Sequence, residues 1–137
     1  MSQLVILDNE AVQALKDPAH RKHRQVVSHV QVVASRKRRA AAIQVVVPTA
    51  VRVEAGWDRT SATWAFPNRL RIADVPLDAV QASAAAAIRV QTGVSVADAH
   101  VGAVIGSISA DKVTVVTSDP ADMCVVAGDN DVVIVAI

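Results

Sequence analysis

The chain has 137 residues, of which 52% are hydrophobic and 20% are charged, and this composition excludes intrinsic disorder. Its one cysteine, Cys124, excludes an internal disulfide framework and is typical of a reducing cytoplasm. No apolar run is as long as a membrane span. We therefore expect a single cytoplasmic domain over residues 1–137 that does not enter the membrane.

Charge is distributed unevenly along the chain. Residues 1–71 hold 12 of the 14 Lys and Arg residues but only five of the 13 Asp and Glu residues, which gives +7 there and −6 in residues 72–137. The basic runs HRKHR (20–24) and RKRR (36–39) lie in the first of these segments. Such asymmetry indicates either a surface for a polyanion beside an acidic site or a solvated helix face.

Hydrophobic periodicity predicts strands that alternate with helices. Short runs of strand-forming residues predict strands over 4–7, 43–47, 68–75, 112–117 and 131–137. Helical spacing, Pro and Gly boundaries and capping residues predict helices over 9–16, 20–41, 48–57, 78–92, 95–108 and 120–128. This order predicts an α/β fold, a three-layer α/β/α sandwich around a parallel sheet of about five strands.

Residues 58–67 form the least regular part of the pattern, and we expect an exposed loop or hairpin there. Trp57 and Trp64 stand on either side of most of this segment. Tryptophan is enriched at interfaces, so packing or partner contact is favoured for both over stacking on an RNA base.

Acidic residues stand at or near the predicted ends of several strands. Asp8 and Asp119 closely follow strands, Glu54 lies in the helix after the second strand, and Asp98 lies in the first turn of a helix. The carboxyl ends of parallel strands meet at one edge of a sheet, so these groups are expected to converge. An all-oxygen set suits Mg²⁺ or Mn²⁺, which can activate water against a phosphodiester. The pattern predicts a metal-dependent nuclease.

Each acid also has a structural interpretation when it is taken singly. Asp119 and Asp122 fit the N-cap and third position of a helix, and Asp8 fits the cap of the first helix. Ser95 and Asp98 form a capping pattern as well. Capping and metal binding are compatible for one carboxylate, and the sequence leaves both open.

Four stretches in order, LVILDNEAVQAL, VVVPTAVRVEAGW, GVSVADAHVGAV and VTVVTSDPADM, resemble the PIN-domain ribonucleases, especially the VapC-type toxins of bacterial toxin–antitoxin pairs. The resemblance extends over essentially the whole chain. It implies Mg²⁺- or Mn²⁺-dependent cleavage of RNA, a cognate antitoxin as partner and a homodimer.

The resemblance also implies roles for individual residues. The positions that match the catalytic acids are Asp8, Glu54, Asp98 and Asp119, of which Asp8, Asp98 and Asp119 are the expected metal ligands. The expected supporting residues are Asp122, Thr117 and Ser118. Two positions depart from the pattern: Asn9 stands where Thr or Ser is frequent, and Arg52 lies close to Glu54.

Other functions receive less support from the sequence. His20, His23 and His29 lack the spacing of zinc ligands and are expected at the surface. His100 is turned about 200° around its helix from Asp98, so we expect a core or surface role for it rather than metal binding. A receiver-like phospho-acceptor domain requires a lysine after the fifth strand, where none exists. A non-catalytic PIN-like RNA-binding or regulatory module remains the alternative to the nuclease.

Overall fold

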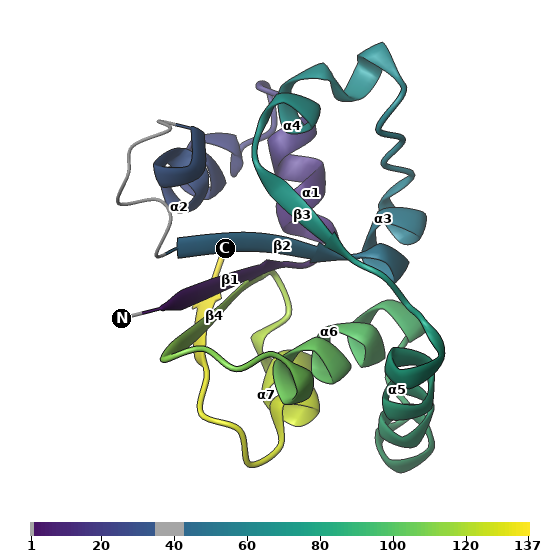
Figure 1. Ribbon diagram of the computed structural model, residues 1–137. Helices are drawn as coiled ribbons and strands as arrows, with labels where there is room; N and C mark the ends of the chain where they lie inside the picture. Colours follow the sequence, from purple (N-terminus) through teal and green to yellow (C-terminus); the bar gives the residue numbers. More distant parts are fainter. Residues whose placement is uncertain (1, 35–42) are drawn as a thin grey trace.

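A parallel β-sheet forms the centre of the molecule in the computed structural model, which describes residues 2–34 and 43–137 (Figure 1). The strands of these residues are β1 (Gln3–Leu7), β2 (Ile43–Pro48), β3 (Ile72–Val75), β4 (Lys112–Thr117) and β5 (Val133–Ala136). Their order across the sheet is β3-β2-β1-β4-β5, and every pairing is parallel. The predicted α/β class is confirmed.

The central strand shows why these residues form a sheet that is covered on both faces. In β1, every residue from Leu4 to Leu7 is buried, and Val5 pairs with Val45 on one side and Thr114 on the other. Continuous Val, Ile and Leu runs of this kind are typical of parallel strands between helix layers.

Helices cover both faces of the sheet (Figure 1). On one side lie α1 (Asn9–Lys16), α2 (His23–Ala34) and α4 (Ala65–Arg69); on the other lie α6 (Val96–Ser107) and α7 (Pro120–Ala127). The α5 helix (Ala79–Thr92) packs beside α6, and α3 (Thr49–Ala55) follows directly on β2. Among the described residues, no helix combines the length and apolar character needed to span a bilayer.

The segment expected to be an exposed loop or hairpin is a turn over residues 58–61, as predicted, but its remainder is helical. Residues Ala62–Trp64 form a 3-10 turn that continues into α4, and both Trp57 and Trp64 are buried. Their rings stack with centroids 5.7 Å apart. Burial of the two tryptophans orders the segment, and local sequence patterns do not reveal it. The two rings pack together, which agrees with the packing role favoured over stacking on an RNA base.

The strand predicted from residue 68 begins later, because Asn68 belongs to α4. Its amide nitrogen donates to the Arg59 carbonyl at 2.9 Å, and its amide oxygen accepts from the Trp57 indole at 2.7 Å. These bonds hold residues 68–69 in the helical turn and leave Ile72–Val75 as β3.

Two further helix boundaries differ from the prediction. The helix expected from His20 begins at His23, and the part of that expectation over residues 35–41 lies outside the described residues. The helix expected to reach Trp57 ends at Ala55, because Gly56 adopts φ 74° and closes α3 through its backbone N–H.

Candidate active site

Asp8 is the most buried acid at the carboxyl edge of the sheet, with 6% of its surface exposed. One carboxylate oxygen accepts the Ala11 N–H at 3.0 Å and caps α1, and the other accepts the Ser118 N–H at 3.3 Å. Burial raises the pKa of Asp8, while hydrogen bonds from Thr117, Ala11 and Ser118 oppose that shift. Asp8 therefore ties the end of β1 to the turn after β4.

That turn orients Asp119. The fully buried Thr117 ends β4, and its hydroxyl oxygen accepts the Asp119 N–H at 2.8 Å. The Asp119 carboxylate in turn accepts the Asp122 N–H at 3.3 Å and caps α7. The capping interpretation of Asp119 is confirmed, and the cap leaves the exposed side chain at the mouth of the site.

Asp98 is the electrostatic centre of the acids. It lies in the first turn of α6, where Ser95 caps the helix by accepting the Asp98 N–H at 3.1 Å. Desolvation by burial and, after it, the charges of four neighbouring carboxylates together raise the pKa of Asp98 to about 6. Those neighbours are Asp122, Glu54, Asp8 and Asp119. The structure thus brings all five predicted acids into one region of negative potential.

Asp122 shares this region closely with Asp119. A hydrogen bond between their side chains, and then charge repulsion from Asp119, raise the pKa of Asp122, while a hydrogen bond with Asp98 acts against the rise. Asp122 consequently belongs to the acidic group as well as to the first turn of α7.

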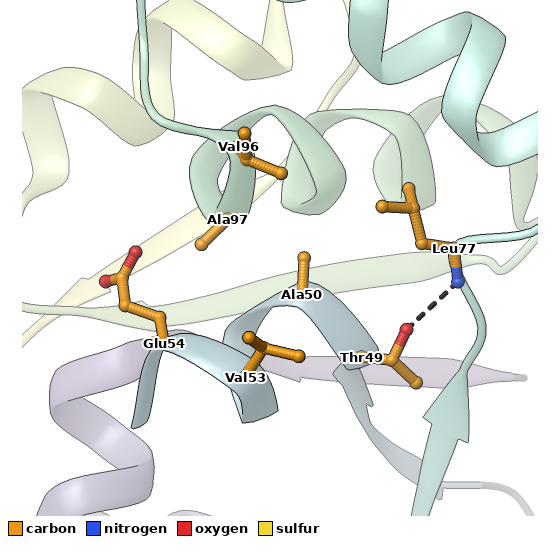
Figure 2. A pocket seen from close by; sticks show the side chains of 7 residues that line it. All are labelled: Thr49, Ala50, Val53, Glu54, Leu77, Val96 and Ala97. Atoms are coloured by element: carbon orange, nitrogen blue, oxygen red, sulfur yellow. Dashed lines mark hydrogen bonds between the residues drawn. The ribbon is translucent and has the colours of Figure 1, made fainter. Parts of the chain in front are cut away.

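Glu54 reaches the site from α3 and is exposed. Its side chain lines one end of a cavity of about 360 Å³, beside the first turn of α6, while Leu77 lines the other end (Figure 2). The remaining walls are mostly apolar and come from Thr49, Ala50, Val53, Val96 and Ala97. Glu54 therefore lies between the apolar surface of this cavity and the group of acids around Asp98.

The donor set fits a hard divalent cation in its chemistry. Every predicted ligand is a carboxylate, and their mutual repulsion favours a neutralising ion. In addition, the buried side-chain oxygen of Asn9, directly after Asp8, meets no hydrogen-bond donor among the described residues. Within those residues, no three Asp, Glu, His or Cys side chains are placed to hold an ion as they stand.

Arg52 turns away from the acids even though it is close to Glu54 in sequence. Its guanidinium donates to Asp74 at 2.9 Å and to the Trp57 carbonyl at 3.1 Å. Arg59 donates to the same Asp74 carboxylate at 2.8 Å. Arg52 is thus a structural cation of the segment after α3, and it pairs with Asp74 rather than with Glu54.

The histidines lie outside the acidic group. His20 contacts Glu10 at 2.9 Å, and His23 contacts the Ala14 carbonyl at 2.7 Å. Sequence reasoning expected surface positions, but both side chains are half-buried against α1. His100 is completely buried, so of the two roles expected for it, core or surface, the structure shows the core role. Its Nδ1 accepts the Ala50 N–H at 3.3 Å.

The raised pKa of Asp98 predicts a pH-dependent stability difference. The folded chain holds this proton more tightly than the unfolded chain, so the contribution is favourable below about pH 4 and is lost as the pH rises through about 6. The variant Asp98→Asn should match the wild type in free energy of unfolding near pH 4 and exceed it by about 1 kcal/mol near pH 7, after allowance for solvent screening. Urea denaturation with EDTA at several pH values measures the difference, and a difference that does not change with pH would contradict the expectation.

Comparison with solved structures supports the fold. No protein-family model matches the chain, and no curated protein matches it. One similar chain belongs to the crystal structure of VapBC2 from Rickettsia felis bound to a DNA fragment from their promoter, with 13% identity, a TM-score of 0.56 and 96% of both chains covered. Another belongs to the crystal structure of FitAcB from Neisseria gonorrhoeae, with 17% identity, a TM-score of 0.56 and the same coverage of both chains. The three-layer α/β architecture is therefore PIN-like.

Proposed function

We propose that this protein is a divalent-metal-dependent endoribonuclease and acts as the toxin of a toxin–antitoxin pair in the cytoplasm. The observation that carries the proposal is the group of acids around Asp98, whose charges jointly raise its pKa. The similarity of the fold to chains of VapBC2 and FitAcB supports the same class. The cognate antitoxin is the expected protein partner and RNA the expected substrate.

Asp8, Asp98 and Asp119 would hold Mg²⁺ or Mn²⁺, with Glu54 as the fourth catalytic acid. The cation supplies Lewis-acid activation of water and stabilises negative charge on the phosphodiester. Asp8 is oriented for this role by its bonds from the Ala11 and Ser118 N–H groups, and Asp119 by the Thr117 hydroxyl. A cation held there would offset the repulsion that raises the pKa of Asp98 and would favour the ionised carboxylate.

A basic groove lies beside α1 and α2. His20, Arg21, His23 and Arg24 line a cavity of about 500 Å³ together with Pro18 and Val27. Cationic side chains bind phosphates largely without regard to base sequence, and this binding weakens with salt. The groove is the surface that we assign to the RNA backbone.

The groove predicts a charge-specific loss of RNA binding. The double variant Arg21→Ala and Arg24→Ala should bind a single-stranded RNA of about 20 nucleotides roughly tenfold more weakly at moderate salt, with a shallower salt dependence. Fluorescence anisotropy in EDTA measures this without cleavage. Arg71→Ala, an exposed arginine at the start of β3, is the matched control and should bind normally. Equal weakening of RNA binding by Arg71→Ala would contradict the assignment of the groove to the RNA backbone.

A second copy of the chain would cover the apolar surface next to Glu54. Val53 is 82% exposed, and Val96 and Leu77 add further aliphatic surface around the same cavity. Val80, in the first turn of α5, is exposed as well. Exposed apolar patches of this kind are typical of protein interfaces. We therefore place the proposed homodimer contact at α3 and the beginnings of α5 and α6.

Incubation of purified protein with RNA tests the function. We expect internal cleavage with Mg²⁺ or Mn²⁺, none with EDTA, and products that carry 5′-phosphate and 3′-hydroxyl ends. The alternative is a non-catalytic RNA-binding or regulatory module, which would bind RNA through its arginines without a metal. RNA binding without cleavage under any divalent cation would establish that alternative instead.

A further inference from the structure

The buried imidazole of His100 connects two helices that carry acids of the site. His100 lies on α6, two residues after Asp98, and its Nδ1 accepts the N–H of Ala50 at 3.3 Å. Ala50 is the second residue of α3, the helix that carries Glu54. One hydrogen bond therefore joins the elements that position Asp98 and Glu54.

The beginning of α3 has no other side-chain cap. The first N–H groups of a helix lack partners within the helix and need acceptors from elsewhere. Pro48 occupies the N-cap position and offers no side-chain acceptor. The hydroxyl of Thr49 instead accepts the Leu77 N–H at 3.0 Å, which ties α3 to the chain before α5 (Figure 2). His100 thus serves as a cap for α3 that comes from another helix.

The burial of His100 also has an energetic cost. Its side chain is fully buried, and its Nε2 has no hydrogen-bond partner among the described residues. In a neutral ring whose Nδ1 accepts, Nε2 carries the hydrogen and is a buried donor without an acceptor. An apolar side chain would avoid this cost, and such unsatisfied groups require an explanation beyond packing.

We infer that His100 is a positioning residue that sets the separation of Glu54 and Asp98 by capping α3 from α6. The inference rests on the proposed function, since it assigns these two acids to one site. Glu54 is exposed at the far end of a helix of seven residues, so a small rotation of α3 displaces its carboxylate. The tie at Ala50 restrains that rotation.

Three substitutions separate this role from simple packing. In His100→Asn, the amide oxygen can occupy the place of Nδ1 and still accept the Ala50 N–H. In His100→Gln, the amide lies nearer the place of Nε2, and His100→Leu removes both nitrogens while it keeps most of the volume. Only the asparagine variant preserves the acceptor that the inference requires.

The first measurement uses metal-free protein and no RNA. Hydrogen exchange of the Ala50 amide, followed by NMR, should be at least about tenfold faster in His100→Leu and His100→Gln than in wild type. His100→Asn should restore protection. Unchanged exchange in the leucine variant would show that the His100 contact does not hold α3.

The second measurement is the dissociation constant for Mn²⁺, determined by electron paramagnetic resonance without RNA. Loss of an orienting residue behind ligands typically weakens metal binding about 10- to 100-fold. We expect about a tenfold rise in His100→Leu and His100→Gln and less than about a threefold rise in His100→Asn. If His100→Leu binds Mn²⁺ with wild-type affinity although its Ala50 amide exchanges faster, the positioning role is wrong and the proposed function is unaffected. A wild type that binds no Mn²⁺ would instead refute the proposed function, and with it the role that depends on it.

Discussion

Asp98→Asn should lower RNA cleavage in Mg²⁺ by about a thousandfold, equivalent to about 4 kcal/mol of transition-state stabilisation. The amide keeps the shape of the side chain but removes the negative charge that the neighbouring carboxylates repel. Because the same change relieves repulsion, the metal-free variant should be at least as stable as the wild type. Loss of activity therefore cannot result from loss of the fold. Single-turnover cleavage of a defined RNA measures the effect.

Variants of the other acids should lose cleavage activity to different extents, according to where each acid lies in the structure. Asp8→Asn and Asp119→Asn should lose activity to a similar extent, whereas Asp122→Asn, in the first turn of α7, should lose only about tenfold. Asp129→Asn, an exposed acid after α7, is the charge-matched control and should retain full activity. Equal activity in wild type and Asp98→Asn would exclude this site as the source of any cleavage.

Gly102→Ala should destabilise the protein by about 2–3 kcal/mol, because α6 packs too closely for a methyl group at this position. A Cβ on Gly102 would lie 2.8 Å from the Ile88 side chain, 2.9 Å from the Val126 Cβ and 3.0 Å from the Val126 carbonyl oxygen. The Ile88 methyl can rotate away, but the Val126 atoms are fixed to the backbone of α7. Relief of this clash would displace α7, whose N-cap is Asp119 and whose first turn contains Asp122.

Gly106→Ala provides the matched control in the same helix. A Cβ at Gly106 meets nothing within 4 Å, and alanine favours the helix over glycine. This variant should gain about 0.5–1 kcal/mol in free energy of unfolding. Urea denaturation of both variants measures the contrast. Equal effects at Gly102 and Gly106 would contradict the close packing of α6 on α7.

The acids at the strand ends could be found from the sequence because their signal is local. Asp8 follows a buried strand and Asp119 follows another, and the parallel sheet brings both to one edge. Their capping roles are equally local, since each carboxylate accepts an N–H three residues later. Short-range patterns therefore predicted where these two acids lie in the fold, and their catalytic role stays a prediction.

Features that depend on distant contacts were missed. The turn over Ala62–Arg69 owes its order to the stacked Trp57 and Trp64 and to the bonds of Asn68, none of which has a periodic pattern. The bond from Ala50 to His100 joins residues 50 positions apart and exists only because α6 packs against α3. Side-chain packing of this kind is specific to the folded chain, and a single sequence does not display it.

The most direct test of the proposed metal centre is an anomalous-scattering measurement on crystals that contain Mn²⁺ at millimolar concentration near neutral pH. The account predicts an anomalous difference peak bounded by the carboxylates of Asp8, Asp98 and Asp119, with Glu54 turned toward it. It predicts no peak there in crystals of Asp98→Asn. Wild-type crystals that bind Mn²⁺ elsewhere, or show no peak among these carboxylates, would contradict the account.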